Sequence, residues 1–138
     1  MICISIPALP PLANRRLMPI ITSKGKPGLC ARGEVGNFQA GAGLVAQIAM
    51  RAQGLSRPLS APVAAVIVFR LGPKTRRDLD AGIKDALDAL TGIVWDDDKQ
   101  VRGLAVLTRP GDDSTDVYVS VCTASAHASL AGLLEQIQ

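Results

Sequence analysis

The chain is poor in cysteine, histidine and aromatic residues. Its 138 residues include three cysteines, one histidine and 3% aromatics. The cysteines, at positions 3, 30 and 122, are odd in number, widely spaced and without a CxxC pair, which excludes zinc-finger spacing and a disulfide framework. Because His127 is the single histidine, a two-histidine nuclease site is also excluded. A hydrolase of this composition has to work at neutral pH with serine, lysine or carboxylates, and the carboxylates would hold a hard metal ion.

Long hydrophobic runs are also absent. No apolar stretch reaches the roughly 18 residues that a membrane span requires. The N-terminal residues show neither the basic region nor the cleavage pattern of a signal peptide. We therefore expect a cytoplasmic protein with no membrane partner. Because a chain of this length buries roughly two-thirds of its unfolded surface on folding, residues 1–138 are expected to form a single domain.

Charge is divided along the chain. Residues 1–77 contain eleven Lys and Arg against one acid, a net charge of +10, whereas residues 78–138 contain four against eleven, a net charge of −7. This asymmetry predicts a basic surface for a polyanion beside an acidic cluster for a cation. Nucleic acid with a divalent metal satisfies both requirements. The alternative is that these are solvated faces, and it is preferred for Arg51, Arg57, Arg102 and Arg109 taken singly.

The N-terminal half is expected to contain two strands, one helix and a long loop. Alternating Ile2, Ile4 and Ile6 predict a strand that ends at Pro7. Residues 7–33 contain five prolines, three glycines and five bases without sustained periodicity, and are interpreted as a long basic loop. Helical spacing of apolar residues predicts a helix over about 34–54. The apolar run 62–70 does not alternate, which predicts a central strand covered on both faces.

The C-terminal half is expected to contain a second helix and two more strands. One apolar stripe predicts the helix over about 79–91, with Gly92 as its cap. Residues 101–108 and 116–123 are predicted strands that the turn 110–114 joins as an antiparallel hairpin, and 124–138 form a C-terminal tail or helix. These elements predict an α+β fold, a mixed sheet of about four strands with two main helices packed on it.

Two acidic groups flank the predicted second helix. Asp78 and Asp80 fall where this helix is expected to begin, where carboxylates can also serve only as an N-cap and first-turn charges. Residues 96–98 are three consecutive aspartates, an arrangement that requires solvent, hydrogen bonds or a cation. Asp80, Lys84 and Asp88 share one ridge of the helix, so Lys84 either assists catalysis or merely bridges two aspartates.

The two acidic groups meet if the strand that starts at Val101 pairs near the start of this helix. Carboxylates from separate elements then supply oxygen ligands for Mg²⁺, which prefers octahedral oxygen coordination. Such an ion polarises a phosphate and activates water for attack on a phosphodiester, and Lys84 beside it stabilises developing charge. The alternative is that the acids are merely solvated.

Three motifs between residues 74 and 101 resemble a known family. They are Arg76-Arg77-Asp78-Leu79-Asp80 followed by Lys84, then Asp88-Ala89-Leu90, then Trp95-x-Asp97-Asp98-x-Gln100-Val101. Together they are similar to the signature of the RusA-type Holliday junction resolvases. Weaker matches occur at Pro10-Pro11 and Asn14-Arg15. The resemblance implies a RusA-like fold and a homodimeric, Mg²⁺-dependent endonuclease, with Mn²⁺ as an alternative ion, that cuts four-way DNA junctions by paired symmetric nicks in recombination and repair.

The resemblance also implies roles for particular residues. Asp78, Asp80 and Asp98 would bind metal, Lys84 would assist catalysis and Arg77 would contact DNA. The spacing to the second acidic group is one residue shorter than in the family. This leaves Asp97 and Asp98 as alternatives for the third ligand, with Asp98 preferred because the following Gln100-Val101 aligns better. The chain also departs from the family at Ala81, commonly Asn, and at Ala13, commonly Ser.

Basic side chains are expected to grip DNA phosphates, which predicts binding that weakens steeply with salt. With one amide, the predicted DNA-binding residues are Asn14, Arg15, Arg16, Lys24, Lys26, Lys74, Arg76 and Arg77. Two other functions stay open. A DNA-structure-binding protein would bind junctions without metal and without cutting them. Another carboxylate- and metal-dependent phosphoryl-transfer enzyme acting on nucleotides would prefer small substrates.

Overall fold

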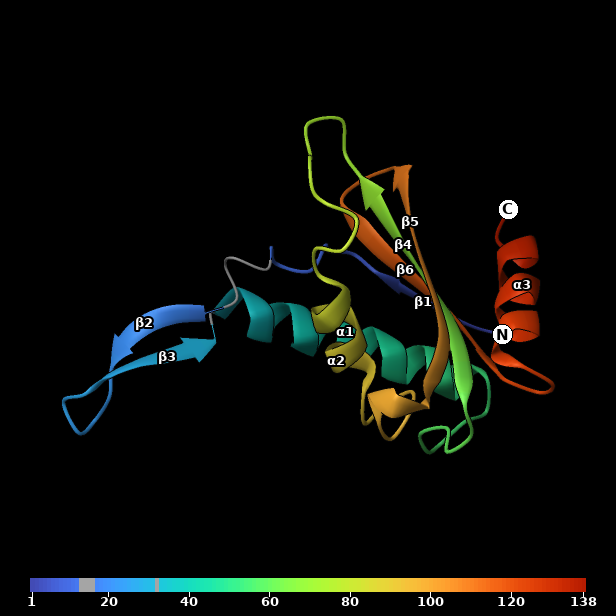
Figure 1. Cartoon of the computed structure of the whole chain (residues 1–138), viewed down its shortest axis with the longest axis horizontal. Coiled ribbons are helices and arrows are strands. Elements are labelled where there is room, and N and C mark those ends of the chain that lie inside the picture. Colours follow the sequence, from blue (N-terminus) through green and yellow to red (C-terminus); the bar gives the residue numbers. More distant parts are fainter. Residues whose placement is uncertain (13–16, 32) are drawn as a thin grey trace.

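A mixed four-stranded sheet forms the centre of the computed structural model, which describes residues 1–12, 17–31 and 33–138 (Figure 1). Its strands are β1 (Ile2–Ile6), β4 (Val63–Leu71), β5 (Val101–Pro110) and β6 (Ser114–Val121). Their order is β1-β6-β4-β5, in which β4 pairs antiparallel with β6 and parallel with β5. The four predicted strands are therefore present, and the predicted central strand has a neighbour on each side.

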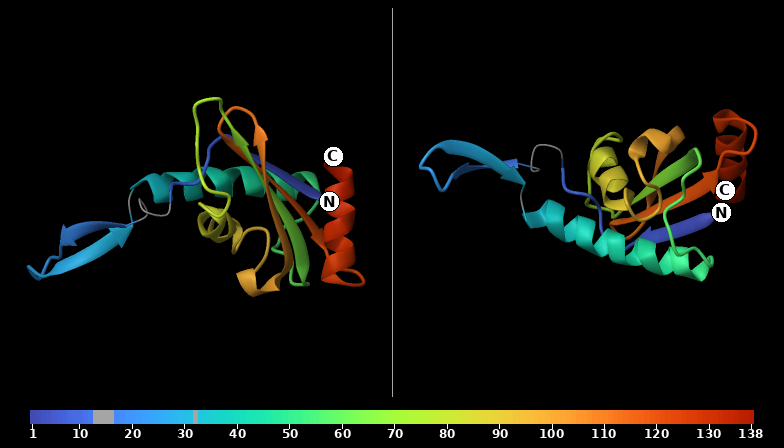
Figure 2. Two further views of the ribbon diagram at one scale, coloured as in Figure 1. Left: turned by 45° about the horizontal axis from the view of Figure 1, so that its top comes forward. Right: turned by 90° about the horizontal axis from the view of Figure 1, so that it is seen from below.

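Helices cover both faces of this sheet (Figure 2). α1 (Gly33–Ala52) and α2 (Ile83–Leu90) pack on one face, and α3 (Ala126–Gln136) packs on the other. Because side chains alternate along a strand, β4 contributes Ile67 to the core under α1 and α2, and Val66 to the core under α3. The predicted α+β fold with two main helices on a mixed sheet is confirmed, and α3 is the predicted C-terminal helix.

The predicted hairpin between 101–108 and 116–123 is wrong, because β4 lies between β5 and β6. β4 is apolar on both faces and is stabilised most by a central position, where both faces are covered. The turn that follows β5 therefore passes across the end of β4, where the amide of Gly111 donates to the carbonyl of Leu71 at 2.8 Å. A Cβ at Gly111 would lie 2.4 Å from the Cβ of Arg70, so this crossing requires glycine.

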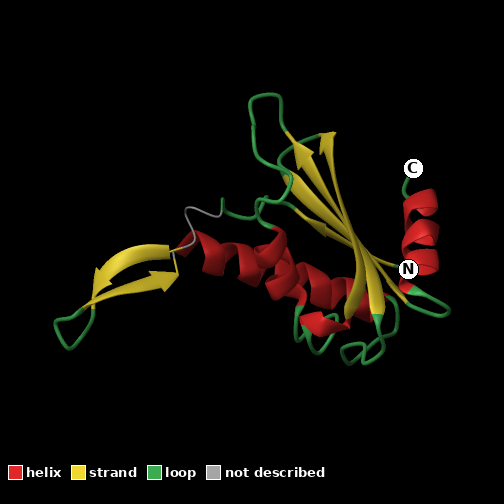
Figure 3. Cartoon of the chain, viewed as in Figure 1, coloured by secondary structure: helices red, strands yellow, loops and turns green. Residues whose placement is uncertain are grey.

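The interpretation of residues 7–33 as an irregular loop is also wrong. β2 (Leu17–Ile21) and β3 (Pro27–Ala31) form an antiparallel ribbon, here called the arm, which projects from the body beyond the start of α1 (Figure 3). A two-stranded ribbon consists of edge strands alone, where proline is tolerated because its missing N–H faces outward. The proline content of this segment therefore argued against a central strand and not against a strand as such.

The second helix begins later than predicted, at Ile83 instead of about residue 79. Gly82, the N-cap, has φ 87°, which interrupts the helical backbone, and a Cβ there would lie 2.7 Å from the Cβ of Pro10. Leu79 is consequently outside the packed stripe and 50% exposed. At the other end Gly92 has φ 86° and follows the C-cap, as predicted.

Within the described ranges, no helix combines the length and the apolar character that crossing a bilayer would require.

Candidate functional site

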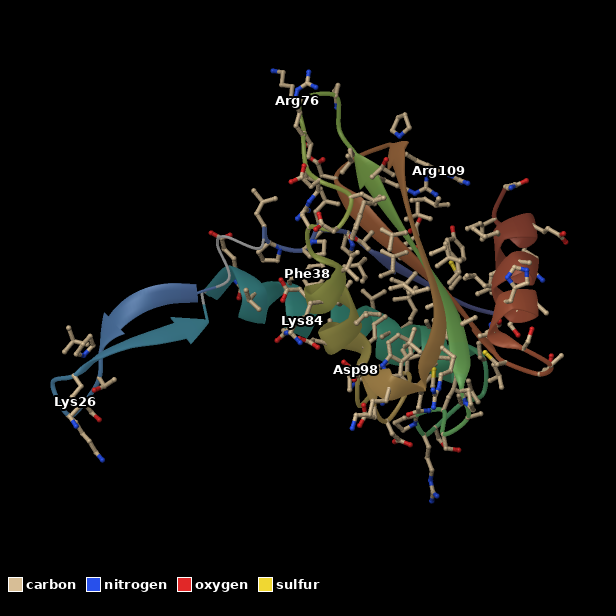
Figure 4. The ribbon with its side chains drawn as sticks, viewed as in Figure 1. Lys26, Phe38, Arg76, Lys84, Asp98 and Arg109 are labelled. Atoms are coloured by element: carbon tan, nitrogen blue, oxygen red, sulfur yellow. The ribbon has the colours of Figure 1, made fainter. Side chains whose placement is uncertain are left out.

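The loop between β4 and α2, residues 72–77, carries two exposed cations, Lys74 and Arg76 (Figure 4). Asp113, in the β5–β6 turn, holds this loop by accepting hydrogen bonds from the Thr75 hydroxyl at 2.6 Å and the Gly72 amide at 2.8 Å. These two bonds, the one from Thr75 foremost, keep the pKa of Asp113 below its usual value. The sequence analysis assigned Asp113 to turn chemistry alone, and no local pattern pointed to a partner about forty residues away.

Arg77 lies half-buried at the base of the same loop. Its Nη2 donates to the carbonyl of Pro10 at 2.6 Å, and its guanidinium lies 5.7 Å above the ring centroid of Phe69. Burial lowers the pKa of Arg77, although the charge of Asp113 acts in the opposite direction. Arg77 thus ties the N-terminal segment to the β4–α2 loop, and its predicted contact with DNA stays a prediction.

Asp78 and Asp80, the first acidic group, are exposed in the turn that precedes α2. Their backbone carbonyls accept from the amides of Ala81 and Ile83 at 3.1 and 3.4 Å. The N-cap of α2 is Gly82, which makes no side-chain capping bond. Helix capping, the structural alternative for these aspartates, is therefore not what they do.

Lys84 lies in the first turn of α2 and is exposed (Figure 4). Its Nζ is 3.4 Å from Oδ2 of Asp88, with the two side chains 67% and 31% exposed. Because Asp80 precedes the helix, the predicted ridge of three residues reduces to this pair. An exposed pair of this kind contributes about 0.3–0.5 kcal/mol, so Lys84 is only weakly restrained.

Asp96, Asp97 and Asp98, the second acidic group, form an exposed turn before β5. Asp97 caps the short 3₁₀ helix η2 (Asp98–Gln100) by accepting from the amide of Lys99 at 2.9 Å. That bond, together with Asp98 and the charge of Lys99, lowers the pKa of Asp97. Asp97 therefore already has a structural task, whereas Asp98 starts the 3₁₀ turn.

Gln100 and Trp95, which belong to the motif around this turn, are structural. The Gln100 amide donates to the carbonyls of Leu59 and Ala61 at 2.7 and 2.9 Å, and its oxygen accepts from the Asp97 amide at 2.9 Å. Trp95 is fully buried, and its indole N–H donates to the Thr91 hydroxyl at 3.0 Å. These contacts attach the second acidic group to the segment that enters β4.

The two acidic groups lie at opposite ends of α2, whose eight residues span about 12 Å. Val101 pairs with Val63 at the start of β4, whereas the first acidic group follows the end of β4 (Figure 4). Among the residues that the structure describes, no three acidic, histidine or cysteine side chains are grouped to hold one ion. The oxygen donors suit Mg²⁺ chemically, but the single chain does not bring Asp78, Asp80 and Asp98 together, contrary to the prediction.

The remaining predicted contacts are in the arm and before it. Lys24 and Lys26 lie exposed in the turn at its tip, which the bond from the Thr22 amide to the Lys26 carbonyl closes at 2.8 Å. Asn14, Arg15 and Arg16 lie outside the described residues. The arm therefore presents two cations far from the sheet.

Two cavities mark what surrounds the ends of α1. One, of about 210 Å³, lies at its N-terminal end between Pro10–Leu12, Glu34 and Thr75–Arg77. The other, of about 470 Å³, lies at its C-terminal end; Gln47, Arg51 and Arg57 line it together with Gly92 and Ile93. The first cavity adjoins the loop that leads to Asp78, and the second adjoins the turn that leads to Asp96.

Comparison with known families matches residues 19–122 to the family described as endodeoxyribonuclease RusA. The chain belongs to the RusA family. The match spans well over half of the chain and includes the arm, both acidic groups and Lys84. RusA-family proteins are Holliday junction resolvase nucleases that act on junction DNA, so the resemblance inferred from the motifs is confirmed. No curated protein matches the chain.

Proposed function

We propose that this RusA-family chain is a Mg²⁺-dependent endonuclease that resolves four-way DNA junctions by paired symmetric nicks, as a homodimer, in recombination and repair. The observation that carries the proposal is the exposure of both acidic groups on loops within the family match. Carboxylates that neither cap the helix nor pair with bases are available to a cation. A two-fold dimer suits a substrate that needs two equivalent cuts.

Asp78, Asp80 and Asp98 are the proposed metal ligands and catalytic acids. Asp97 is the weaker candidate because its carboxylate already accepts from the Lys99 amide. Lys84, held only by the exposed pair with Asp88, is free to move toward a phosphate, where its charge would stabilise the developing negative charge. The bound ion would supply a polarised phosphate and an activated water.

The proposed DNA contacts are the exposed cations of the β4–α2 loop and of the arm. Lys74 and Arg76 lie a few residues before Asp78, so a phosphate bound there places the DNA strand beside the first acidic group. Lys24 and Lys26 would reach DNA away from the cut. Asn14, Arg15, Arg16 and Arg77 complete the proposed set, and Mn²⁺ is expected to replace Mg²⁺.

The test is incubation of a synthetic four-way junction with and without Mg²⁺, with a linear duplex of the same sequence as control. We expect paired nicks at symmetric positions in the junction alone, and in the presence of the metal alone. Junction binding without cleavage under any divalent ion would identify a structure-binding protein instead. Turnover of free nucleotides, with no salt-sensitive affinity for DNA, would identify a different phosphoryl-transfer enzyme.

Site variants then test the assignment. Asp78→Asn, Asp80→Asn and Asp98→Asn are expected to bind the junction and to lose cleavage by at least about a hundredfold, because each removes a charged ligand. Lys84→Ala should reduce turnover strongly with little change in affinity. Binding is measured by fluorescence anisotropy and nicking by denaturing gels. Asp88→Asn, which frees Lys84 without removing a proposed ligand, is the matched control and should retain cleavage. Full nicking by all three Asp→Asn variants would refute the site.

A further inference from the structure

We propose that each catalytic centre is shared between two chains, with Asp78 and Asp80 from one chain and Asp98 from its partner. The inference rests on the proposed function and explains why the single chain does not assemble the three acids. α2 holds the two acidic groups apart at its two ends, and the described residues contain no group of three ligands. An ion that needs all three must therefore draw on a second copy.

The outward face of α1 is suited to contact with that second copy. No charged residue occurs between Glu34 and Arg51. The exposed side of the helix, here called the outer stripe, is formed by Asn37, Gly41, Leu44 and Ile48. Leu44 is 61% exposed and Ile48 59% exposed, one helical turn apart. A Cβ built on Gly41 meets nothing within 4 Å, which leaves room there for a close helix approach.

Charge identifies the occupant of the outer stripe. DNA is bound by cations, and this stripe has none. In a two-fold contact the same patch meets itself, and residues near the axis lie against their own copies. Like charges would then repel one another, whereas an uncharged apolar stripe at the middle of a helix is complementary to itself. A second copy of the chain therefore fits this surface, and a charged partner does not.

The direction of α1 determines which acids such a contact brings together. The N-terminal end of α1 shares a cavity with Thr75–Arg77, just before Asp78, and its C-terminal end shares a cavity with Gly92 and Ile93, shortly before Asp96. Two copies of α1 packed antiparallel about their midpoints would set the first acidic group of each chain alongside the second acidic group of the other. One contact would thus produce two equivalent centres, as paired nicking requires.

The test uses heterodimers purified after co-expression of two differently tagged chains, Asp80→Asn and Asp98→Asn. In the shared arrangement one centre carries both lesions and the other carries none. The heterodimer should therefore nick the junction at roughly half the wild-type rate per dimer, although each homodimeric variant is inactive. If the three acids acted within one chain, both centres would be damaged and the heterodimer would be inactive, which would overturn the proposal.

Matched heterodimers and metal binding complete the experiment. A heterodimer of Asp78→Asn and Asp80→Asn has one lesion in each centre and should stay inactive. Mn²⁺ binding, measured by electron paramagnetic resonance, should show roughly half the wild-type number of tight sites in the Asp80/Asp98 heterodimer. The same metal result without any junction cleavage by wild-type protein would reject the proposed function while supporting the shared centre.

The outer stripe is tested separately through the oligomeric state. Leu44→Lys should convert the dimer to a monomer in sedimentation equilibrium, because it places two cations near the axis. Mixing it with Leu44→Glu should restore a dimer. Leu104→Lys, at an exposed leucine of β5, is the control and should remain dimeric. An unchanged dimer in Leu44→Lys would overturn pairing through α1.

Discussion

At the scale of single residues, polar side chains distant in sequence hold the two acidic loops in place. Asp113 anchors the β4–α2 loop, Arg77 joins that loop to Pro10, and Gln100 attaches the second acidic group to residues 59–61. Each satisfies backbone groups of a segment that has no regular structure of its own. The candidate site therefore depends on residues that contact neither DNA nor metal.

Replacement of Asp113 should loosen the β4–α2 loop. Asp113→Ala removes the acceptor of the Gly72 amide and the Thr75 hydroxyl, so amide hydrogen exchange in 72–77 should accelerate and junction affinity should fall several-fold. Asp113→Asn keeps an acceptor oxygen and tolerates the φ of 60°, so it should preserve the loop. Equal exchange in wild type and Asp113→Ala would contradict this role.

The anchor should also depend on pH. Because the pKa of Asp113 is lowered in the folded state, its contribution is present at neutral pH, above the pKa of the unfolded chain. It is lost as the pH falls through the lowered value. Protection of residues 72–77 should therefore decline at acid pH in the wild type. Asp113→Asn, which has no carboxyl group to titrate, should not show that decline.

At the scale of elements, α2 and the arm decide what the chain can reach. α2 is short because Gly82 has a positive φ and packs against Pro10, and its length separates the two acidic groups. The arm extends two lysines away from the body (Figure 1). A two-stranded ribbon alone is marginally stable in water, so contact with DNA or a partner is expected to stabilise it.

Removing the charges at the tip of the arm should change the salt dependence of binding. If Lys24 and Lys26 each contact a phosphate, the double change to Gln should reduce the slope of log affinity against log salt by about 2. Cleavage of bound junction should be unaffected, because the tip is remote from both acidic groups. The control is Arg102→Gln, at an exposed position of β5, which should leave the slope unchanged. An unaltered slope in the double variant would exclude the arm from the DNA contact.

At the scale of the whole molecule, the two faces of the sheet have separate tasks. α1 and α2, with both acidic groups beside them, lie on one face, and α3 closes the other (Figure 2). β4 is buried between the two layers and connects them. Stability on the α3 face should therefore be separable from catalysis on the opposite face.

Leu133→Ala tests that separation. Leu133 is 2% exposed and packs with Ala64, Val66 and Val68, so its truncation should lower the free energy of unfolding by about 2–5 kcal/mol, as measured by urea denaturation. Turnover at temperatures where the variant is folded should match the wild type. Leu104→Ala, at an exposed leucine, should cost much less. A large loss of turnover in folded Leu133→Ala would show that the two faces are coupled.

Local patterns in the sequence were sufficient for much of this protein. Alternation in β1, the unbroken apolar run of β4 and the stripe of α1 depend on neighbouring residues, so the strands, the long helix and the α+β class could be predicted. The motifs at 76–84 and 95–101 were sufficient for the RusA family, and the family match confirms it. Burial of Trp95 and the exposure of the aspartates follow the same local chemistry.

Only the tertiary structure decided how these parts meet. The position of β4 between β5 and β6, the ribbon of the arm and the late start of α2 at Ile83 depend on contacts between residues far apart in sequence. The same contacts separate Asp98 from Asp78 and Asp80. Residue types show that the chain can bind a cation, but the distance between its ligands follows from packing, which no local pattern contains.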